Sequence, residues 1–302
     1  MSVTTRTRRI AAVAAGCAAA ALATTASGAP GQLLDWPDLL GRPLPSPTER
    51  IAYGPGPEQF GELWLPQGRG PFPVVLMVHG GCWLAAVAKL SIMNYAADDL
   101  RRRGIAVWNI EYRGVDQPGG GYPGTFEDVA AGADALTKIA ATHQLKLGKI
   151  VALGHSAGGH LVLWLAARPR LPAGSRLQAA RPLPIAGVVS VGGLPDLAPE
   201  AAQGVCGVGT IARLVGVPSA DRANVYADTS PSELGVGPEP QLQINGDEDG
   251  IAPPSFAHAY AAKMQNPRLR TIVMPATGHV ELIAPGSAAW NQVVESLNAL
   301  LH

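Results

Sequence analysis

Short apolar runs alternate with stretches compatible with helices along most of the chain. The runs are rich in β-branched and other large apolar residues, which is typical of buried strands. They lie at residues 60–65, 74–78, 105–112, 150–153, 185–191, 241–245 and 271–274. Strands that alternate with helices form parallel sheets covered on both faces. The pattern therefore predicts an α/β fold with a mostly parallel central sheet.

Size and composition favour one large globular domain. The chain has 302 residues, of which 47% are hydrophobic and 15% charged, and this balance supports a substantial core. We expect the domain to cover residues 49–302. Its interval 194–236 is too long for a plain connection between strands. We expect this interval to form a small cap segment.

The N-terminus has the order of regions found in a secretory signal. Three arginines, Arg6, Arg8 and Arg9, precede an Ala-rich apolar stretch, and small residues follow up to Ala29. Such a segment is removed on export, and it is too short and too poor in large apolar residues for a stable membrane span. We therefore expect a signal peptide over 1–29 and a secreted or periplasmic bacterial protein.

Two weaker patterns overlap this signal, and a Pro-rich stretch follows it. Residues 7–10 weakly resemble a twin-arginine signal, and residues 15–17 weakly resemble a lipoprotein attachment site. Residues 30–48 contain five prolines, which predicts an extended lead-in to the domain and no second domain.

The most informative motif joins the fourth apolar run to the helical stretch behind it. Gly154-His155-Ser156-Ala157-Gly158 follows the strand-like residues 150–153 directly. Strand, Gly-x-Ser-x-Gly turn and helix form the context of a nucleophile elbow, in which a strained backbone projects the serine hydroxyl above the sheet. The short pattern also occurs in ordinary turns, so Ser156 needs partners elsewhere in the chain.

A glycine loop supplies the first of these partners. His79-Gly80-Gly81-Cys82-Trp83 follows the apolar run 74–78. Acyl transfer builds negative charge on a carbonyl oxygen, and a preorganised backbone N–H aimed at that oxygen is worth about 3 kcal/mol. The candidate oxyanion-hole donors are the N–H groups of Gly81, Cys82 and Ala157; the alternative is a plain strand-ending turn.

A base and an acid follow the last two predicted strands. His279 lies on a loop after 271–274, whereas His258 falls within a helical pattern. Asp247, Glu248 and Asp249 all follow the run 241–245. We choose Asp249 because a carboxylate a few residues beyond the strand can turn toward the histidine loop, and Asp247 is the alternative. The order Ser156, Asp249, His279 is that of α/β-hydrolases.

These motifs resemble those of secreted bacterial members of the α/β-hydrolase esterase/lipase superfamily. The closest branch has His-Gly-Gly-x-Trp loops and includes arylformamidase-like and carboxylesterase-like proteins. The resemblance covers roughly residues 50–302. It rests on 79–83, 121–129, 154–159, 246–253 and 278–285. Cys82 replaces the third glycine of the hormone-sensitive-lipase loop, which argues against that branch, although its backbone N–H remains available.

The resemblance implies a serine hydrolase that cleaves small-molecule carboxylic esters, or related small acyl or formyl amides, through a Ser-Asp-His triad and an acyl-enzyme. The α/β-hydrolase fold would carry Ser156, Asp249 and His279 at the site. Trp83, Tyr122 and the 194–236 segment are candidates to line the substrate pocket, although each could equally be ordinary packing. A serine peptidase of the prolyl-oligopeptidase type and a non-catalytic binding module of the same fold are the alternatives.

Charge and motif content argue against nucleic-acid, metal and cofactor binding, and the cysteines allow one disulfide. The net charge is zero and there is no basic patch, so we expect no nucleic-acid partner. No metal-ligand spacing or dinucleotide motif is present in the sequence, so no cofactor or metal is expected. Export would leave Cys82 and Cys206, which could form a disulfide in an oxidising compartment or remain two buried thiols.

Overall fold

A computed structural model describes residues 1, 32–198, 202 and 204–302 of the protein. The chain divides into two units, Met1–Gln32 and Leu33–His302, and all the elements below belong to the second. The expected signal peptide at 1–29 lies outside the described residues, apart from Met1. Within the described ranges, no helix is long and apolar enough to cross a membrane.

An eight-stranded sheet with the order β1-β2-β4-β3-β5-β6-β7-β8 forms the centre of this unit. β1 and β2 pair antiparallel with their neighbours, and all other pairs are parallel. The strands are β1 (Glu49–Ala52), β2 (Phe60–Trp64), β3 (Phe72–Val78), β4 (Ala106–Ile110), β5 (Leu145–His155), β6 (Gly187–Val191), β7 (Gln241–Gly246) and β8 (Leu269–Met274). The predicted α/β fold with a mostly parallel sheet is confirmed.

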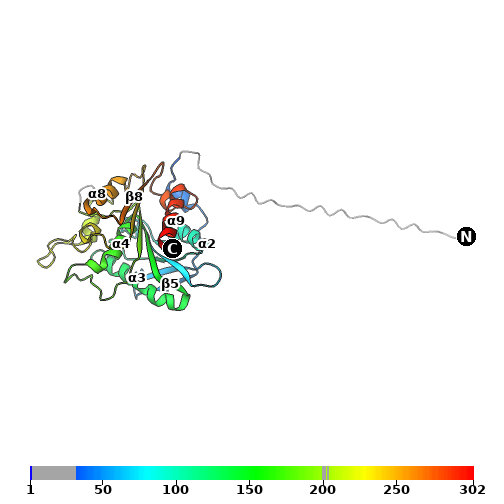
Figure 1. Ribbon diagram of the computed structural model, residues 1–302, viewed down its shortest axis with the longest axis horizontal. Coiled ribbons are helices and arrows are strands. Elements are labelled where there is room, and N and C mark those ends of the chain that lie inside the picture. Colours follow the sequence, from blue (N-terminus) through cyan, green and yellow to red (C-terminus); the bar gives the residue numbers. More distant parts are fainter. Residues whose placement is uncertain (2–31, 199–201, 203) are drawn as a thin grey trace. The chain divides into compact units, whose positions relative to one another are not determined.

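Helices cover both faces of the sheet (Figure 1). Successive side chains of a strand point to opposite faces, and the central strands are apolar on both. Leu76 of β3 belongs to one core cluster, and its neighbours Val75 and Met77 belong to the other. The first cluster packs under α3 (Gly124–His143), α4 (Ala157–Ala167) and α6 (Thr210–Val215), and the second under α2 (Asn94–Arg102) and α9 (Ala288–Leu301).

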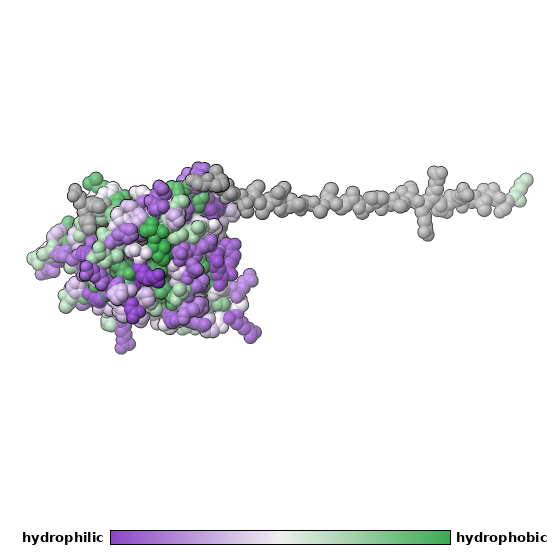
Figure 2. All heavy atoms as spheres, turned by 45° about the horizontal axis from the view of Figure 1, so that its top comes forward, coloured by the Kyte–Doolittle hydropathy of each residue, from purple (hydrophilic) through white to green (hydrophobic). Residues whose placement is uncertain are grey.

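The remaining short elements lie in the connections. They are α1 (Trp36–Leu40), α7 (Pro231–Leu234), α8 (Pro254–Met264) and the 3₁₀ turns η1 (Leu90–Met93), η2 (Arg168–Arg170) and η3 (Glu281–Ile283). The face drawn in Figure 2 is largely hydrophilic, with hydrophobic side chains gathered in small patches. The 194–236 segment contributes α6 and α7, both of which pack onto the first core cluster.

Two elements differ from the sequence-based expectation. The edge strand β1 was not expected, and part of the stretch 30–48 is helical where an extended lead-in was expected. The Asp35 side chain accepts from the N–H of Asp38, and the Asp38 side chain accepts from the N–H of Asp35. This reciprocal capping box, with Pro37 in the first turn, favours a helix start. α1 follows from it.

Candidate active site

Ser156 lies at the sharp turn between β5 and α4. Its backbone has φ 55° and ψ −120°, a conformation that L-residues rarely adopt. Its N–H donates to the carbonyl of Val191, 2.9 Å away. A Cβ at Gly154 would lie 2.1 Å from the carbonyl oxygen of Gly158, and one at Gly158 would lie 2.1 Å from that of Val78. Only glycine fits on either side of this strained serine.

His279 and Asp249 form a buried pair at the ends of the last two strands. The Nδ1 of His279 lies 2.7 Å from Oδ2 of Asp249. The other carboxylate oxygen of Asp249 accepts from the N–H groups of Ile251 and Ala252, both at 2.9 Å. Burial acts to raise the pKa of Asp249, but His279 and these two N–H groups outweigh it and hold the pKa below its ordinary value. The carboxylate is therefore ionised and held in place.

The rival residues for the acid and base lie elsewhere. Asp247 and Glu248 are exposed, and Asp247 accepts from the N–H of Thr277 at 3.2 Å. His258 is exposed on α8. A glycine clears the space for the ring of His279: a Cβ at Gly192 would lie 2.9 Å from its Cε1.

The glycine loop after β3 presents free backbone donors beside Ser156. Gly81 and Cys82 have φ of 107° and 55°, so their amides do not follow a regular strand. Within the described residues, the N–H groups of Gly81, Cys82 and Ala157 donate to no protein acceptor. Backbone N–H groups without a protein partner beside a nucleophile are the kind of donor that an oxyanion requires.

A disulfide ties this loop to the 194–236 segment. Cys82 and Cys206 are joined, with their Cα atoms 5.4 Å apart and a sequence separation of 124. The backbone of Cys82 thus belongs to the loop beside the nucleophile, while its side chain is anchored in a different part of the fold.

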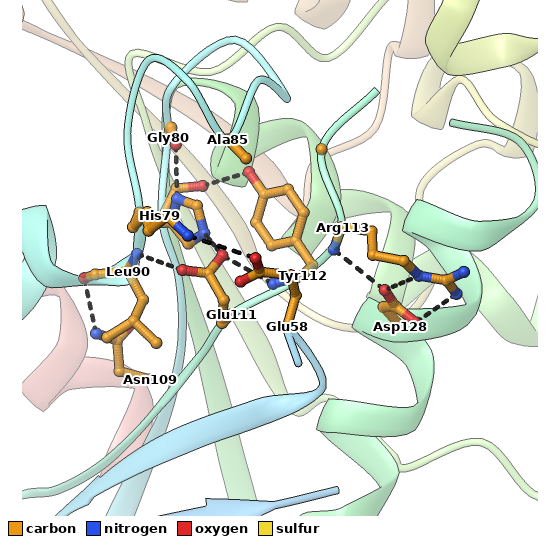
Figure 3. Close-up of polar contacts among 12 residues, drawn as sticks. Glu58, His79, Gly80, Ala85, Leu90, Asn109, Glu111, Tyr112, Arg113 and Asp128 are labelled. Carbon is orange, nitrogen blue, oxygen red and sulfur yellow. Dashed lines mark hydrogen bonds and ion pairs between the residues drawn. The ribbon is translucent and has the colours of Figure 1, made fainter. Parts of the chain in front are cut away.

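A buried hydrogen bond between His79 and Glu111 supports the base of the loop (Figure 3). His79 Nε2 lies 2.7 Å from Oε1 of Glu111, and the hydroxyl of Tyr112 donates to the His79 carbonyl at 3.0 Å. Burial acts to raise the pKa of Glu111, but His79 and the N–H groups of Leu90 and Tyr112 lower it below its ordinary value. This network fixes the point at which the loop leaves β3.

Four of the candidate site residues, Gly81, Cys82, Ser156 and His279, line one cavity of about 340 Å³ together with apolar side chains and His155. The described residues that line it are Trp36, Leu40, Gly81, Cys82, Val87, Ala88, Ile92, His155, Ser156, Ile251 and His279. The cavity is at the small end of the range of about 300–1,000 Å³ that is common for small-molecule sites.

The two residues expected to line the substrate pocket lie elsewhere. Trp83 is fully buried, and its ring packs edge-on against His160 with centroids 5.4 Å apart. The guanidinium carbon of Arg222 lies 3.6 Å from the centroid of the Tyr122 ring. Tyr122 borders a separate surface hollow. Both aromatic side chains therefore pack within the protein. Of the residues of 194–236 that the structure describes, none lines the cavity that contains Ser156.

His155 and Trp36 are cavity residues that the sequence-based reasoning missed. His155 Nε2 donates to the carbonyl of His279 at 3.1 Å. Burial, and then the neighbouring His279, hold the pKa of His155 well below 6.5, so its ring is neutral. His155 precedes Ser156 directly, and this position could have indicated that it lines the cavity. For Trp36, the capping pattern around it could have indicated the helix on which it lies. Among the described residues, no group of three His, Cys, Asp or Glu could hold a metal ion.

Solved structures share this architecture at low sequence identity. One is esterase B from Lactobacillus rhamnosis, inhibited by a tributyrin phosphonate, with a TM-score of 0.69 and 20% identity. The match covers 85% of this chain and 88% of the esterase chain. Thermogutta terrifontis esterase 2, phosphoramylated by tabun, has a TM-score of 0.66 and 18% identity, covering 89% and 97%.

A third similar structure is much longer than this chain. A bifunctional GH43-CE protein from Bacteroides eggerthii has a TM-score of 0.68 and 21% identity, and the match covers 83% of this chain but only 38% of that protein. No curated protein matches the sequence.

A family model identifies the chain more specifically than these fold matches. The model described as BD-FAE matches residues 62–264, more than half of the chain. The matched region begins within β2 and contains β3 to β7, the glycine loop, the Ser156 turn and Asp249. The protein belongs to the BD-FAE family and has the α/β-hydrolase fold.

Proposed function

We propose that the protein is a serine hydrolase that cleaves carboxylic esters through an acyl-enzyme. The observation that carries the proposal is the strained Ser156, which shares one cavity with His279 and with the unpaired N–H groups of the glycine loop. Backbone strain at a non-glycine residue persists where function requires it. A binding module would have no need of an ionised Asp249 behind His279.

Each group has a defined role in the first step. The Nδ1–H of His279 donates to Asp249, which leaves Nε2 as the proton acceptor. His279 takes the proton of Ser156 as its oxygen attacks the ester carbonyl. Gly81, Cys82 and Ala157 donate to the oxyanion that forms. The tetrahedral intermediate then collapses, and the alcohol leaves with the proton from His279.

The second step reverses these roles with water as the nucleophile. His279 takes a proton from water, which attacks the acyl carbon, and the same N–H groups hold the second oxyanion. The bond to Ser156 then breaks, its oxygen regains the proton, and the carboxylic acid is released. Asp249 stabilises the imidazolium in both steps without taking its proton.

The structural neighbours support ester chemistry over peptide hydrolysis. Two of them are esterases modified by phosphorus reagents, and a third is a truncated carbohydrate esterase from gut microbiota. Phosphorus reagents of this type modify activated nucleophiles. We therefore infer an ester substrate, and preferential hydrolysis of peptide-like amides would contradict this inference.

Hydrolysis of p-nitrophenyl esters by purified protein tests the proposal. Ser156→Ala should lower kcat by about 10⁴-fold or more, because the nucleophile is removed while the fold persists. Ser255→Ala, at an exposed serine at the start of α8, is the matched control and should match the wild type. Activity of Ser156→Ala within tenfold of the wild type, or cleavage of aminoacyl anilides in preference to esters, would contradict the proposal.

We also propose that the protein is exported by its first 29 residues and works outside the bacterial cytoplasm. The Cys82–Cys206 disulfide supports this, because such bonds persist in oxidising compartments and are rare in the cytosol. N-terminal sequencing of protein recovered from the periplasm and medium should give a start near residues 27–30. An uncleaved chain that stays in the cytoplasm would overturn the proposal.

A further inference from the structure

The short helix α1 forms one wall of the catalytic cavity. Trp36 and Leu40, at its two ends, both line the cavity together with Ser156. The Trp36 ring meets the rings of His155 and His279 edge-on, with centroids 6.0 Å and 6.4 Å away. This wall comes from the stretch before the first strand, outside the region that the family model matches.

α1 is held in this position by contacts with the main body. A five-residue helix is too short to be stable alone. Leu39 is fully buried in the second core cluster. The N–H of Leu34 donates to Oε1 of Glu281, whose Oε2 accepts from the N–H of Gly278 beside His279.

A second set of contacts fixes the C-terminal end of the helix. Arg42 donates from Nη1 to the carbonyl of Pro285 at 2.9 Å, and the Tyr95 hydroxyl donates to the carbonyl of Arg42 at 3.2 Å. Glu281 and Pro285 belong to the chain segment that follows His279. The position of α1 is therefore coupled to the loop that carries the proposed base.

The rest of the cavity lining is also largely apolar. It includes Val87, Ala88, Ile92 and Ile251, and among the described residues that line the cavity none is Lys, Arg, Asp or Glu. Three of the lining residues are large hydrophobic side chains left open to solvent: Leu40 is 49% exposed, Val87 60% and Ile251 38%. Apolar side chains grouped at the mouth of a site indicate a binding surface.

We propose that Trp36 and Leu40 of α1 bind the apolar group of a neutral carboxylic ester against Val87 and Ile251. The inference rests on the proposed function and adds the substrate class. The cavity volume of about 340 Å³ has room for about ten non-hydrogen atoms at roughly 30 Å³ each. An unbranched acyl or alkyl chain of medium length, or one aromatic ring, fits both the size and the lining. A charged group would lose its hydration there without gaining a partner.

Substrate series that lengthen one side of the ester at a time test the proposal. One series holds p-nitrophenol constant and extends the acyl group from acetate to octanoate. The other holds acetate constant and extends the alcohol from methyl to hexyl. In the wild type, kcat/KM should rise with chain length in one of the series and then level off, because the cavity is filled. The responding series identifies which side of the ester lies against α1.

Leu40→Ala and Leu44→Ala form a matched pair of variants. Leu44 lies in the same N-terminal stretch and is 57% exposed but does not line the cavity. In the series that responds to chain length, Leu40→Ala should lower the ratio of kcat/KM for the six-carbon substrate over that for the shortest substrate by about three- to tenfold, because buried methylene contacts are lost. Trp36→Ala should lower this ratio by about tenfold or more, and Trp36→Phe should restore part of it. Leu44→Ala should leave the ratio unchanged.

Two results would overturn the inference while leaving the proposed function intact. One is a Leu40→Ala or Trp36→Ala enzyme that keeps the chain-length ratio of the wild type. The other is an equal loss on all substrates, which would mean that α1 only supports the fold. Failure of the wild type to hydrolyse any ester would instead refute the proposed function.

Discussion

The Nδ1 of His279 lies 2.7 Å from Oδ2 of Asp249, although 30 residues separate the two in the sequence. The pairing depends on the neighbouring strands β7 and β8, since each residue follows the end of one of them. The second oxygen of Asp249 is held by two backbone N–H groups. The carboxylate is therefore held in one orientation, and this in turn fixes the orientation of the His279 imidazole ring.

Asp249→Asn should lower kcat by about 10³- to 10⁴-fold, because an amide in place of the carboxylate favours the wrong tautomer of His279. Asp247→Asn is the matched control two residues away, and it should cost less than tenfold because Asp247 is exposed and its side chain accepts from the N–H of Thr277, away from His279. Ester hydrolysis by both variants checks the prediction. A larger loss in the Asp247 variant would show that the acid was assigned to the wrong residue.

Reduction of the Cys82–Cys206 disulfide should lower both stability and activity. A crosslink between residues 124 apart should contribute about 2–4 kcal/mol to the free energy of unfolding. Because the N–H of Cys82 is a proposed oxyanion donor, kcat should fall by up to about 10²-fold, with KM changing less. Urea unfolding and ester kinetics with and without a reductant measure these effects.

Cys206→Ser provides the control for this experiment. The variant should behave like the reduced wild type and should no longer respond to the reductant. A reductant that impairs the variant as strongly as the wild type would show that the effect does not come from this disulfide.

His160 should make the protein less stable in acid. Its ring is fully buried, with Nε2 donating to the carbonyl of Thr229 at 2.8 Å, and burial lowers its pKa from 6.5 to about 4. The unfolded chain takes up a proton on this ring below pH of about 6.5, whereas the folded protein does so only below about 4. Stability is therefore fully present above pH 6.5 and is lost as the pH falls toward 4, by at most about 3 kcal/mol.

His160→Gln isolates this contribution, because the amide can still donate to Thr229 and does not titrate. Urea unfolding at pH 7, 6, 5 and 4 should give a shallower loss of stability for the variant than for the wild type. The His155 ring contributes an acid loss of the same sign in both proteins. Parallel stability curves for the two proteins would contradict the assignment to His160.

Much of the fold was predictable from local sequence patterns. Fully buried strand segments are apolar on both faces, so β3 and the second half of β5, from residue 150 on, stand out as continuous apolar runs. The turn at Ser156 was predictable because only small residues tolerate its close contacts. β1 escaped prediction because it is a short edge strand whose residues are mostly exposed.

The substrate-facing surface was less predictable, because it depends on contacts between distant segments. Trp83 follows the glycine loop directly, but its ring turns inward onto His160. Tyr122 is held by Arg222 from the 194–236 segment. Trp36 comes from a Pro-rich stretch, and its place beside His279 depends on Leu39 and Glu281. Nothing in the local sequence around these residues specifies such partners.

Labelling with a fluorophosphonate tests the central claim most directly, because only an activated serine attacks the reagent rapidly. Intact-mass measurement followed by peptide mapping should find one adduct, on Ser156. Labelling should be abolished in Ser156→Ala and strongly slowed in Asp249→Asn, while Ser255→Ala should label like the wild type. A folded protein that takes up no label, or that carries it on a residue other than Ser156, would contradict the account.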